Sequence, residues 1–244
     1  MNTPLHKLPR IFLMQTIVVQ RLRMRFSKVG PTRFIGHLDL ARTLERSLNR
    51  ARIPMAYTQG FNKRMRMQLA TALPLGFTSD CELADLFLQE RMAVDEAQAR
   101  LSSKIAPGLI IHDLWEVPLK TAPLQNMLQS ATYTVTVLDP VDRGELAQGI
   151  ADLLAAATLP RQRRDKTYDL RPQILSLSLA EGEELVLHMH LWQLPSKTGR
   201  PDEVAAALGL DPLATRIHRT TLILDEAADL NEATDSPIEL NDLS

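Results

Sequence analysis

Cysteine is almost absent from this 244-residue chain, in which Cys81 is the only one. A single thiol cannot form an internal disulfide, a cysteine-only metal site or a four-iron cluster, because each of these needs several thiolates. Any cluster chemistry connected with the protein therefore belongs to another chain. Cys81 itself stands in an apolar, strand-like stretch, where we expect a small buried side chain rather than a nucleophile.

Long apolar runs are lacking as well. No stretch approaches the roughly 20 apolar residues of a membrane helix, and the composition is 45% apolar and 23% charged with a net charge of −1. We therefore predict a cytoplasmic globular protein without a membrane partner. The basic, apolar N-terminus resembles a secretory signal, but Gln15 interrupts it and no small-x-small cleavage site follows. Residues 1–16 are instead predicted to be a disordered leader, and an over-extended translation start is the alternative for this stretch.

The usual catalytic motifs are also missing. The chain has no Walker loop, no G-x-G-x-x-G, no G-x-S-x-G and no H-E-x-x-H, so nucleotide-cofactor, serine-hydrolase and zinc-protease interpretations lose support. His188 and His190 could share a metal, but they need a third ligand. His218 falls on a strand that is not expected to neighbour theirs. No metal and no cofactor are predicted.

Charge is distributed unevenly along the chain. Between Arg21 and Arg66, twelve Lys and Arg residues stand against Asp39 and Glu45, which gives this segment a net charge of +10. No basic residue follows Arg219, whereas seven acidic residues do. This asymmetry predicts a half that faces a polyanion and an acidic, disordered tail at 226–244.

The hydrophobic periodicity predicts the same order of elements twice. Strands are expected at 17–26, 66–72, 82–88 and 109–115, with helices at 37–52 and 94–105. In the second half, strands are expected at 133–138, 174–179, 185–192 and 215–224, with helices at 142–157 and 202–208. We therefore predict an α+β protein with two tandem ferredoxin-like (βαββαβ) domains, at 17–117 and 131–225, joined by a linker at 118–130.

A cationic ridge is predicted on the first helix. Asp39, Arg42, Arg46 and Arg50 follow spacings of three, four and four, so they line the face opposite the leucines. Guanidinium groups in such a row suit the phosphates of a nucleic acid. A solvated helix face on which Glu45 pairs with a neighbouring arginine is equally compatible. Arg21, Arg23 and Arg25 alternate along the preceding strand and are expected on the open face of the sheet.

Two further features flank this helix. His37 and Asp39 fall in its first turn, where the helix dipole favours negative charge. Asp39 can therefore simply stabilise the helix, or His37 can act near neutral pH as an acid or base beside Arg33 and a bound phosphate. After the helix, residues 57–64 form a loop by composition, in which Phe61 could stack on a base or fill the protein's own core.

The run from K-V-G-P-T-R-F-I-G-H-L-D-L to Y-T-Q-G-F-N, followed by L-P-L-G-F-T-S-D-C-E-L-A-D, resembles the radical SAM-linked protein family. This is an uncharacterised domain found beside or fused to radical SAM enzymes. The chain departs from the family at Gly36 and Thr58, where Ser is expected, and at Lys63-Arg64, which replaces Pro-His. The resemblance places the following residues on signature positions: Arg33, His37, Asp39, Arg42, Arg46, Gln59, Gly60, Phe61, Asn62, Pro74, Gly76, Ser79, Glu82 and Asp85.

From the basic segment and this resemblance we expect a non-catalytic RNA-binding or substrate-presenting protein that works with a separate radical SAM enzyme, in RNA modification for example. The chain itself is not expected to be a radical SAM enzyme. Two alternatives stay open: an RNA-processing enzyme with His37 and Asp39 as catalytic candidates, and a protein–protein adaptor. The expected RNA-binding residues are Arg33, His37, Asp39, Arg42, Arg46, Arg50, Gln59, Gly60, Phe61, Asn62 and Lys63.

Overall fold

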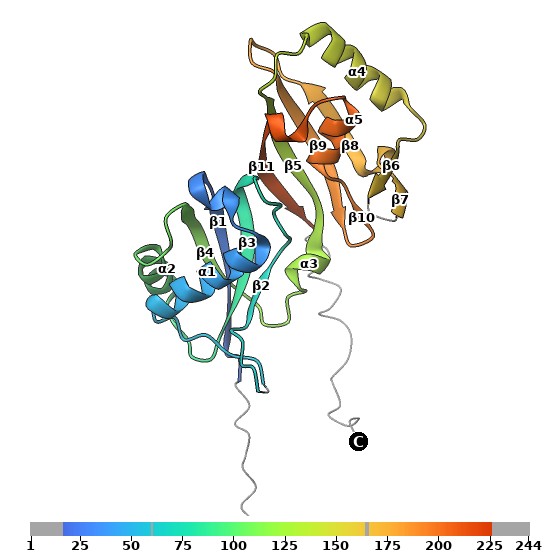
Figure 1. Ribbon diagram of the computed structural model, residues 1–244. Helices are drawn as coiled ribbons and strands as arrows, with labels where there is room; N and C mark the ends of the chain where they lie inside the picture. The colour runs from blue at the N-terminus through green and yellow to red at the C-terminus, as the bar shows by residue number, and fades with distance from the viewer. Residues whose placement is uncertain (1–16, 60, 164–165, 226–244) are drawn as a thin grey trace, which may run out of the picture.

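A computed structural model describes residues 17–59, 61–163 and 166–225. The predicted leader at 1–16 and the acidic tail at 226–244 lie outside these ranges. Within them, helices and strands form an α+β fold around one large mixed sheet of nine strands, with a separate two-stranded hairpin (Figure 1). The predicted α+β class is confirmed.

The first half places its strands in the order β4–β1–β3–β2, and every neighbouring pair is antiparallel. Alternate residues of β1 and β3 are apolar and buried, and the sheet face that they form packs on the leucines of α1 at fourfold spacing. Its elements are β1 (Gln20–Lys28), α1 (His37–Arg50), β2 (Met67–Leu69), β3 (Thr78–Leu88), α2 (Val94–Ser102) and β4 (Leu109–Val117).

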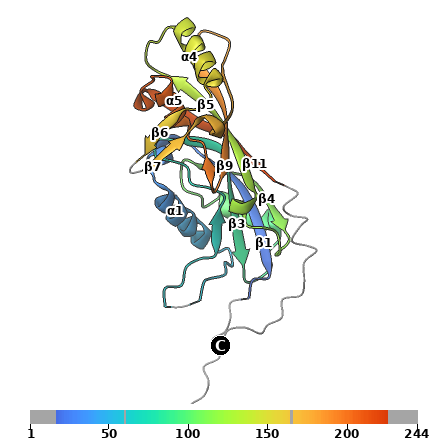
Figure 2. The ribbon, with the colours of Figure 1, turned by 90° about the vertical axis from the view of Figure 1, so that its right-hand side faces the viewer.

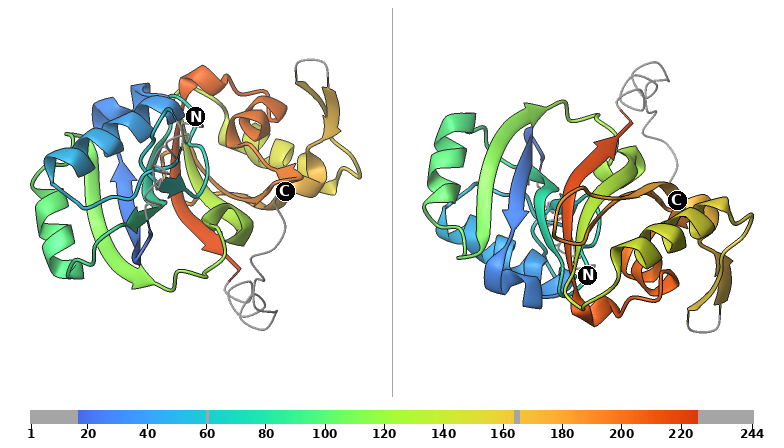
Figure 3. Two further views of the ribbon diagram at one scale, coloured as in Figure 1. Left: turned by 90° about the horizontal axis from the view of Figure 1, so that it is seen from below. Right: turned by 90° about the horizontal axis from the view of Figure 1, so that it is seen from above.

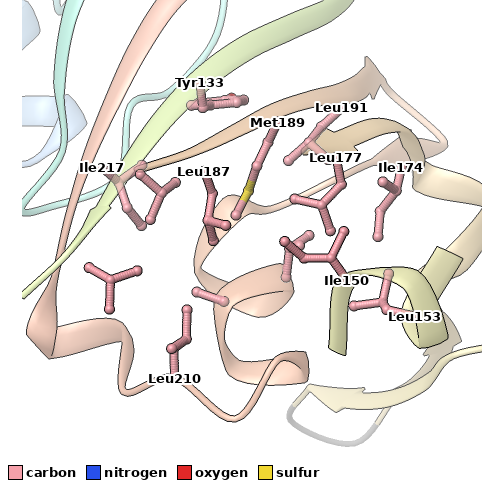
Figure 4. Packing of buried hydrophobic residues seen from close by; sticks show 14 of the residues in the cluster. Tyr133, Ile150, Leu153, Ile174, Leu177, Leu187, Met189, Leu191, Leu210 and Ile217 are labelled. Carbon is pink, nitrogen blue, oxygen red and sulfur yellow. The ribbon is translucent and has the colours of Figure 1, made fainter. Parts of the chain in front are cut away.

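The second half repeats this arrangement with the order β8–β9–β5–β11, again with antiparallel neighbours. Its core lies between the sheet and the helices, and Figure 4 shows the apolar side chains that fill it. Its elements are β5 (Leu128–Val137), α4 (Arg143–Ala155), β6 (Pro160–Arg163), β7 (Lys166–Asp169), β8 (Ile174–Leu179), β9 (Val186–Leu194), β10 (Lys197–Thr198), α5 (Pro201–Ala207) and β11 (Thr215–Leu224).

The two halves meet edge to edge through β3 and β11. These strands run parallel and pair at two positions, His218 with Thr78 and Arg219 with Ser79. The remaining part of the same β3 edge pairs with β2. Seen from above and below, the strands follow one another across this junction without a break (Figure 3). The helices α1, α4 and α5 all lie on one side of this continuous sheet (Figure 2).

The predicted linker packs against the first half. It contains the short helix α3 (Leu124–Met127), and β5 already begins at Leu128. Thr121, Ala122 and Leu124 are buried against the sheet face that lies opposite the helices. This segment therefore covers part of the sheet face that was predicted from the sequence to be exposed to solvent.

The predicted position of the strand arginines is wrong for two of the three. Arg21 and Arg23 are 2% and 4% exposed and share the carboxylate of the fully buried Asp85. Residues 118–127 cover them, and Arg21 also donates to the backbone carbonyls of Thr121 and Ala122. Only Arg25 is exposed, and it pairs with Asp113 at 2.5 Å. Arg21 and Arg23 are thus part of the protein's interior.

Most predicted elements are found within a few residues of their expected bounds, and β8 and β11 match at both ends. The hairpin β6–β7 and the helix α3 were not predicted from the sequence. In the part of the chain that the structure describes, no helix is long and apolar enough to span a membrane.

Candidate functional site

The outward face of α1 carries the predicted cationic ridge. Leu40, Leu44 and Leu48 are buried beneath the helix, which turns Asp39, Arg42, Arg46 and Arg50 to solvent. Gly36 precedes the helix without a side-chain cap, and Asp39 lies in the first turn, where its charge favours the helix dipole. The sequence prediction for this face is confirmed in its geometry.

Few acidic groups neutralise this ridge. Arg42 and Asp39 approach to only 3.5 Å, with both side chains more than 60% exposed, so their pairing contributes little. Arg50 donates to the Ser47 hydroxyl and to the backbone carbonyl of Lys104. Among the described residues, Arg46 forms no ion pair or hydrogen bond through its side chain. The ridge therefore keeps an excess positive charge that faces water.

The loop after α1 is a hairpin, and the described residues at its tip, Gln59 and 61–64, are exposed. Tyr57 pairs with Met65, and the backbone N–H of Thr58 donates to the carbonyl of Arg64 at 2.8 Å. Phe61 is 109% exposed, which contradicts the possibility that it fills the protein's own core. Gln59, Asn62 and Lys63 beside it are exposed as well, and Gly60 lies outside the described residues.

A hydrogen bond joins this hairpin to the ridge. The phenol of Tyr57 donates to Asn49 Oδ1 at 3.3 Å, and Asn49 lies in the last turn of α1 beside Arg50. Arg64 on the returning strand of the hairpin is also exposed, whereas the Arg66 guanidinium lies 5.3 Å from the centre of the Phe87 ring, beside Arg21 on the other face of the sheet. The ridge of α1 and the hairpin tip thus form one basic surface, which we call the α1 surface: Arg42, Arg46, Arg50, Gln59, Phe61, Asn62, Lys63 and Arg64.

His37 lies apart from the hairpin, at the opposite end of α1. There it lines a depression of about 270 Å³ between the halves, together with Thr71, Gln125, Gln193 and Thr198. Among the described residues, no side chain forms a hydrogen bond or ion pair with the His37 imidazole. The structure therefore separates His37 from Gln59, Phe61 and Lys63, with which the sequence analysis had grouped it.

Arg33 also lies away from the ridge. It belongs to the 3₁₀ helix Gly30–Phe34, where its guanidinium lies 4.6 Å from the centre of the Phe34 ring. Its backbone carbonyl accepts from Gly76 N at 2.8 Å. Arg33 consequently faces a hollow between the two halves rather than the α1 surface.

A buried polar cluster ties the halves together beneath their junction. Arg219 is 1% exposed and donates to Glu82 at 2.8 Å, to the hydroxyl of Tyr133 and to the carbonyl of Ala72. Burial acts to lower the pKa of Arg219, but the Glu82 carboxylate together with Tyr133 and Cys81 outweighs it, so that this pKa lies above its ordinary value. Burial raises the pKa of Tyr133, so its phenol stays protonated. Arg219 is therefore a charged tie between β11 and β3.

Lys28 lies beside this cluster, but its ammonium group forms no hydrogen bond with the members of the cluster. Its side chain is 1% exposed, and Nζ has no hydrogen-bond partner among the described residues. Burial lowers the pKa of Lys28, Glu82 opposes this and Arg219 adds to it. Nearby Cys81 is buried, and burial raises the pKa of its thiol to about 11. A protonated, buried thiol is a poor nucleophile, as the sequence analysis expected.

On the other face of the junction, five polar side chains form a chain of hydrogen bonds. Thr78 Oγ1 lies 2.8 Å from His218 Nδ1, whose Nε2 lies 3.0 Å from Asp80. Ser27 donates to Asp80 at 3.1 Å and contacts His112 Nε2 at 2.5 Å. Thr78 and His218 are 140 residues apart, so no local sequence signal could have revealed this network.

Metal binding finds no support in these groupings. Within the described ranges, no three His, Cys, Asp or Glu side chains are arranged so that they could hold a metal ion. His188 and His190 lie on β9, which β5 separates from the strand of His218. His190 instead contacts the Ser130 hydroxyl at 2.9 Å.

Several of the signature residues are buried or are needed for a backbone turn, and so support the fold itself. Glu82 and Asp85 are buried partners of Arg219 and of Arg21 and Arg23, and Ser79 is fully buried beside Cys81. Gly76 has φ of +88°, which the turn after Pro74 requires. The exposed signature residues therefore lie on α1, on the hairpin and, at Gly76, in the turn at 74–77, and Arg33 on the 3₁₀ helix is half-buried.

Comparison with known proteins gives three findings. The family model described as "Uncharacterized protein conserved in bacteria (DUF2344)" matches residues 21–201. A ribosomal protein L11 methyltransferase of Nitrosomonas europaea is 30% identical over 139 residues, which are 52% of this chain and 44% of that protein. The chain thus spans less than half the length of this curated relative. A chain from the crystal structure of a Cbf5-Nop10-Gar1 complex matches with a TM-score of 0.45 and 10% identity, over 86% of this chain and 50% of that one.

Proposed function

The chain belongs to this family of uncharacterized proteins conserved in bacteria, and we propose that it is a non-catalytic RNA-binding accessory protein. The observation that carries the proposal is the α1 surface, on which exposed arginines and an exposed aromatic hairpin are joined by the Tyr57–Asn49 hydrogen bond. Proteins that hold single-stranded nucleic acid combine such cations with aromatic side chains on which bases stack.

The geometry of the α1 surface suits this role. Arg42, Arg46 and Arg50 lie one turn apart along about 12 Å of helix, and each has a planar guanidinium that can pair with phosphate oxygens. Phe61 is a stacking platform at the far end of the same surface. Phosphate contacts from the helix would position a strand whose bases reach the hairpin.

Two finer points belong to the proposal. The resemblance of residues 21–115 to the radical SAM-linked family supports a separate radical SAM enzyme as the partner, since one cysteine cannot hold a cluster. We also propose that each half is a ferredoxin-like unit. The strand orders β4–β1–β3–β2 and β8–β9–β5–β11 support this, because both follow the βαββαβ pattern with antiparallel neighbours.

RNA retention by the purified full chain tests the proposal. We expect a labelled mixture of structured RNA to bind at low salt and to be released as salt rises. The double substitution Arg42→Glu and Arg46→Glu should abolish retention. The matched control is Arg91→Glu with Arg100→Glu, which changes the same charge at exposed arginines outside the α1 surface. Equal retention by both variants and the wild type, or no retention at all, refutes the proposal.

The same preparation distinguishes the two alternatives. RNA cleavage that is lost in His37→Ala would indicate the processing enzyme, although the structure places no orienting partner beside the His37 imidazole within the described residues. Co-purification followed by mass spectrometry addresses the partner. Recovery of a radical SAM enzyme together with RNA is the expected result, whereas a protein partner without RNA would indicate the adaptor.

A further inference from the structure

A hollow of about 510 Å³ lies between the two halves, on the side of the junction where β11 begins. Its walls come from the 3₁₀ helix Gly30–Phe34, the turn at 74–77, the end of β5 and the segment 212–217. We call it the junction groove. None of the residues of the α1 surface lines it, so it is distinct from the proposed RNA site.

The junction groove collects exposed apolar side chains. Eleven large apolar side chains are exposed in the part of the chain that the structure describes, and four of them line this one hollow. They are Phe34 at 64%, Leu75 at 64%, Leu138 at 49% and Leu213 at 92% exposure. A cluster of this kind from four separate segments is typical of an interaction surface rather than of scattered surface residues.

Two of these side chains lie in turns that hydrogen bonds hold in place. Leu75 precedes Gly76 in a turn, and both neighbours of that turn, Leu73 and Phe77, are buried in the core of the second half. Leu213 lies in the 3₁₀ turn Pro212–Ala214, where its N–H donates to Asp211 Oδ1 at 2.9 Å. Apolar anchors that are fixed before binding lose little entropy when a partner covers them.

Among the residues that line the groove, Arg33 and Arg216 stand against one acidic side chain, Asp202. Arg216 is exposed and, within the described ranges, has no acidic partner, and Arg33 contacts only the Phe34 ring through its guanidinium. Asp202, the acidic residue of the lining, is bound by Arg200 through two hydrogen bonds. A ligand that fits must therefore offer both apolar surface and a negative charge.

We propose that the junction groove is the docking site for a segment of a partner protein that carries large apolar side chains beside a carboxylate. The apolar side chains would contact Leu75, Leu138 and Leu213, and the carboxylate would pair with Arg216. A protein segment fits the groove because the four apolar side chains form an open, widely exposed surface. This site is independent of the α1 surface, so the partner can bind while RNA is held.

Peptide selection on the full chain tests this. A random-peptide library displayed on phage should yield sequences with two or more large apolar residues next to Asp or Glu. For a synthetic peptide of that kind, Leu213→Asp should raise the Kd at least about tenfold, and Arg216→Glu should do the same. Leu119→Asp, at an exposed leucine on the 118–127 segment away from the groove, should leave the Kd unchanged.

Thermal unfolding of each variant verifies that it is folded, which the 92% exposure of Leu213 makes the expected result. Selected peptides without carboxylates, or peptides that bind both groove variants like the wild type, overturn the proposal. A concentration-dependent dimer that Leu213→Asp dissociates also overturns it, because the occupant is then a second copy of this chain. Loss of RNA retention in Leu213→Asp would overturn the independence of the two sites, whereas failure of RNA binding in the wild type leaves the peptide result unaffected.

Discussion

The arginines of β1 and those of α1 stand within one basic segment, yet they have opposite environments. Arg21 and Arg23 are buried against Asp85 beneath residues 118–127. Arg42 and Arg46 face water with little acidic compensation. The net charge of a segment therefore overstates what it offers to a polyanion, because part of that charge neutralises a carboxylate inside the protein.

Removing the buried carboxylate should give the largest effect. Asp85→Ala leaves Arg21 and Arg23 buried without a counter-charge, and we expect a loss of about 3–5 kcal/mol in the free energy of unfolding. Urea denaturation measures it. Arg46→Ala, a change at an exposed and unpaired side chain, should stay within about 0.5 kcal/mol of the wild type. Equal stability of the two variants would contradict the distinction between buried and exposed arginines.

The second largest effect on stability is expected at the Arg219–Glu82 ion pair, which ties the two halves together. Arg219→Leu leaves the buried Glu82 carboxylate without its hydrogen-bonded counter-charge, and we expect it to cost about 3 kcal/mol. A double-mutant cycle with Glu82→Leu isolates the pair, since the double variant should recover part of that loss. Additive single effects in urea denaturation would mean that the Arg219–Glu82 contact does not couple β11 to β3.

A smaller effect is expected at the hairpin tip, and on binding rather than on stability. Phe61→Ala should weaken RNA binding by about 1–3 kcal/mol if a base stacks on the ring. Because Phe61 is fully exposed, the midpoint of thermal unfolding should not change. Unaltered RNA affinity in a filter-binding assay would remove the hairpin from the α1 surface and leave the ridge alone.

Lys28 gives the smallest expected change, and it is a gain. Lys28→Met removes a buried ammonium group without a partner and should stabilise the protein by about 1 kcal/mol at neutral pH. Burial lowers the pKa of Lys28 in the folded state below its ordinary value of 10.5. Between these two pKa values only the unfolded state keeps the proton, so wild-type stability rises with pH there.

The gain from Lys28→Met is therefore full below the folded-state pKa and shrinks as pH approaches 10.5. Unfolding measurements from neutral to alkaline pH test this. A gain that stays constant over that range would mean that the Lys28 ammonium is not penalised by burial.

Local patterns predicted much of the fold and of the α1 surface. Leucines at fourfold spacing located α1 and turned its arginines outward, and β8 and β11 were predicted at their observed bounds. The strand alternation of Arg21 and Arg23 was also identified correctly, but alternation does not say what covers the second face. Their partner Asp85 and the covering residues 118–127 are distant in the sequence.

The junction could not be predicted either, because the residues that form it are also distant in the sequence. Parallel pairing of β3 with β11 joins residues about 140 positions apart, and it creates the Arg219 tie, the His218 network and the junction groove together. Leu213 and Leu75 are unremarkable in the sequence. They become a shared surface only when the two halves meet.

The salt dependence of RNA binding tests most directly whether the α1 arginines carry it. In filter binding, the slope of log Kobs against log salt reports the number of neutralised phosphates. The triple alanine variant of Arg42, Arg46 and Arg50 should reduce the magnitude of that slope by about 2–3. Arg25→Ala, an exposed arginine of β1 paired with Asp113, should leave it unchanged. An unchanged slope in the triple variant would contradict the assignment of RNA binding to the α1 surface.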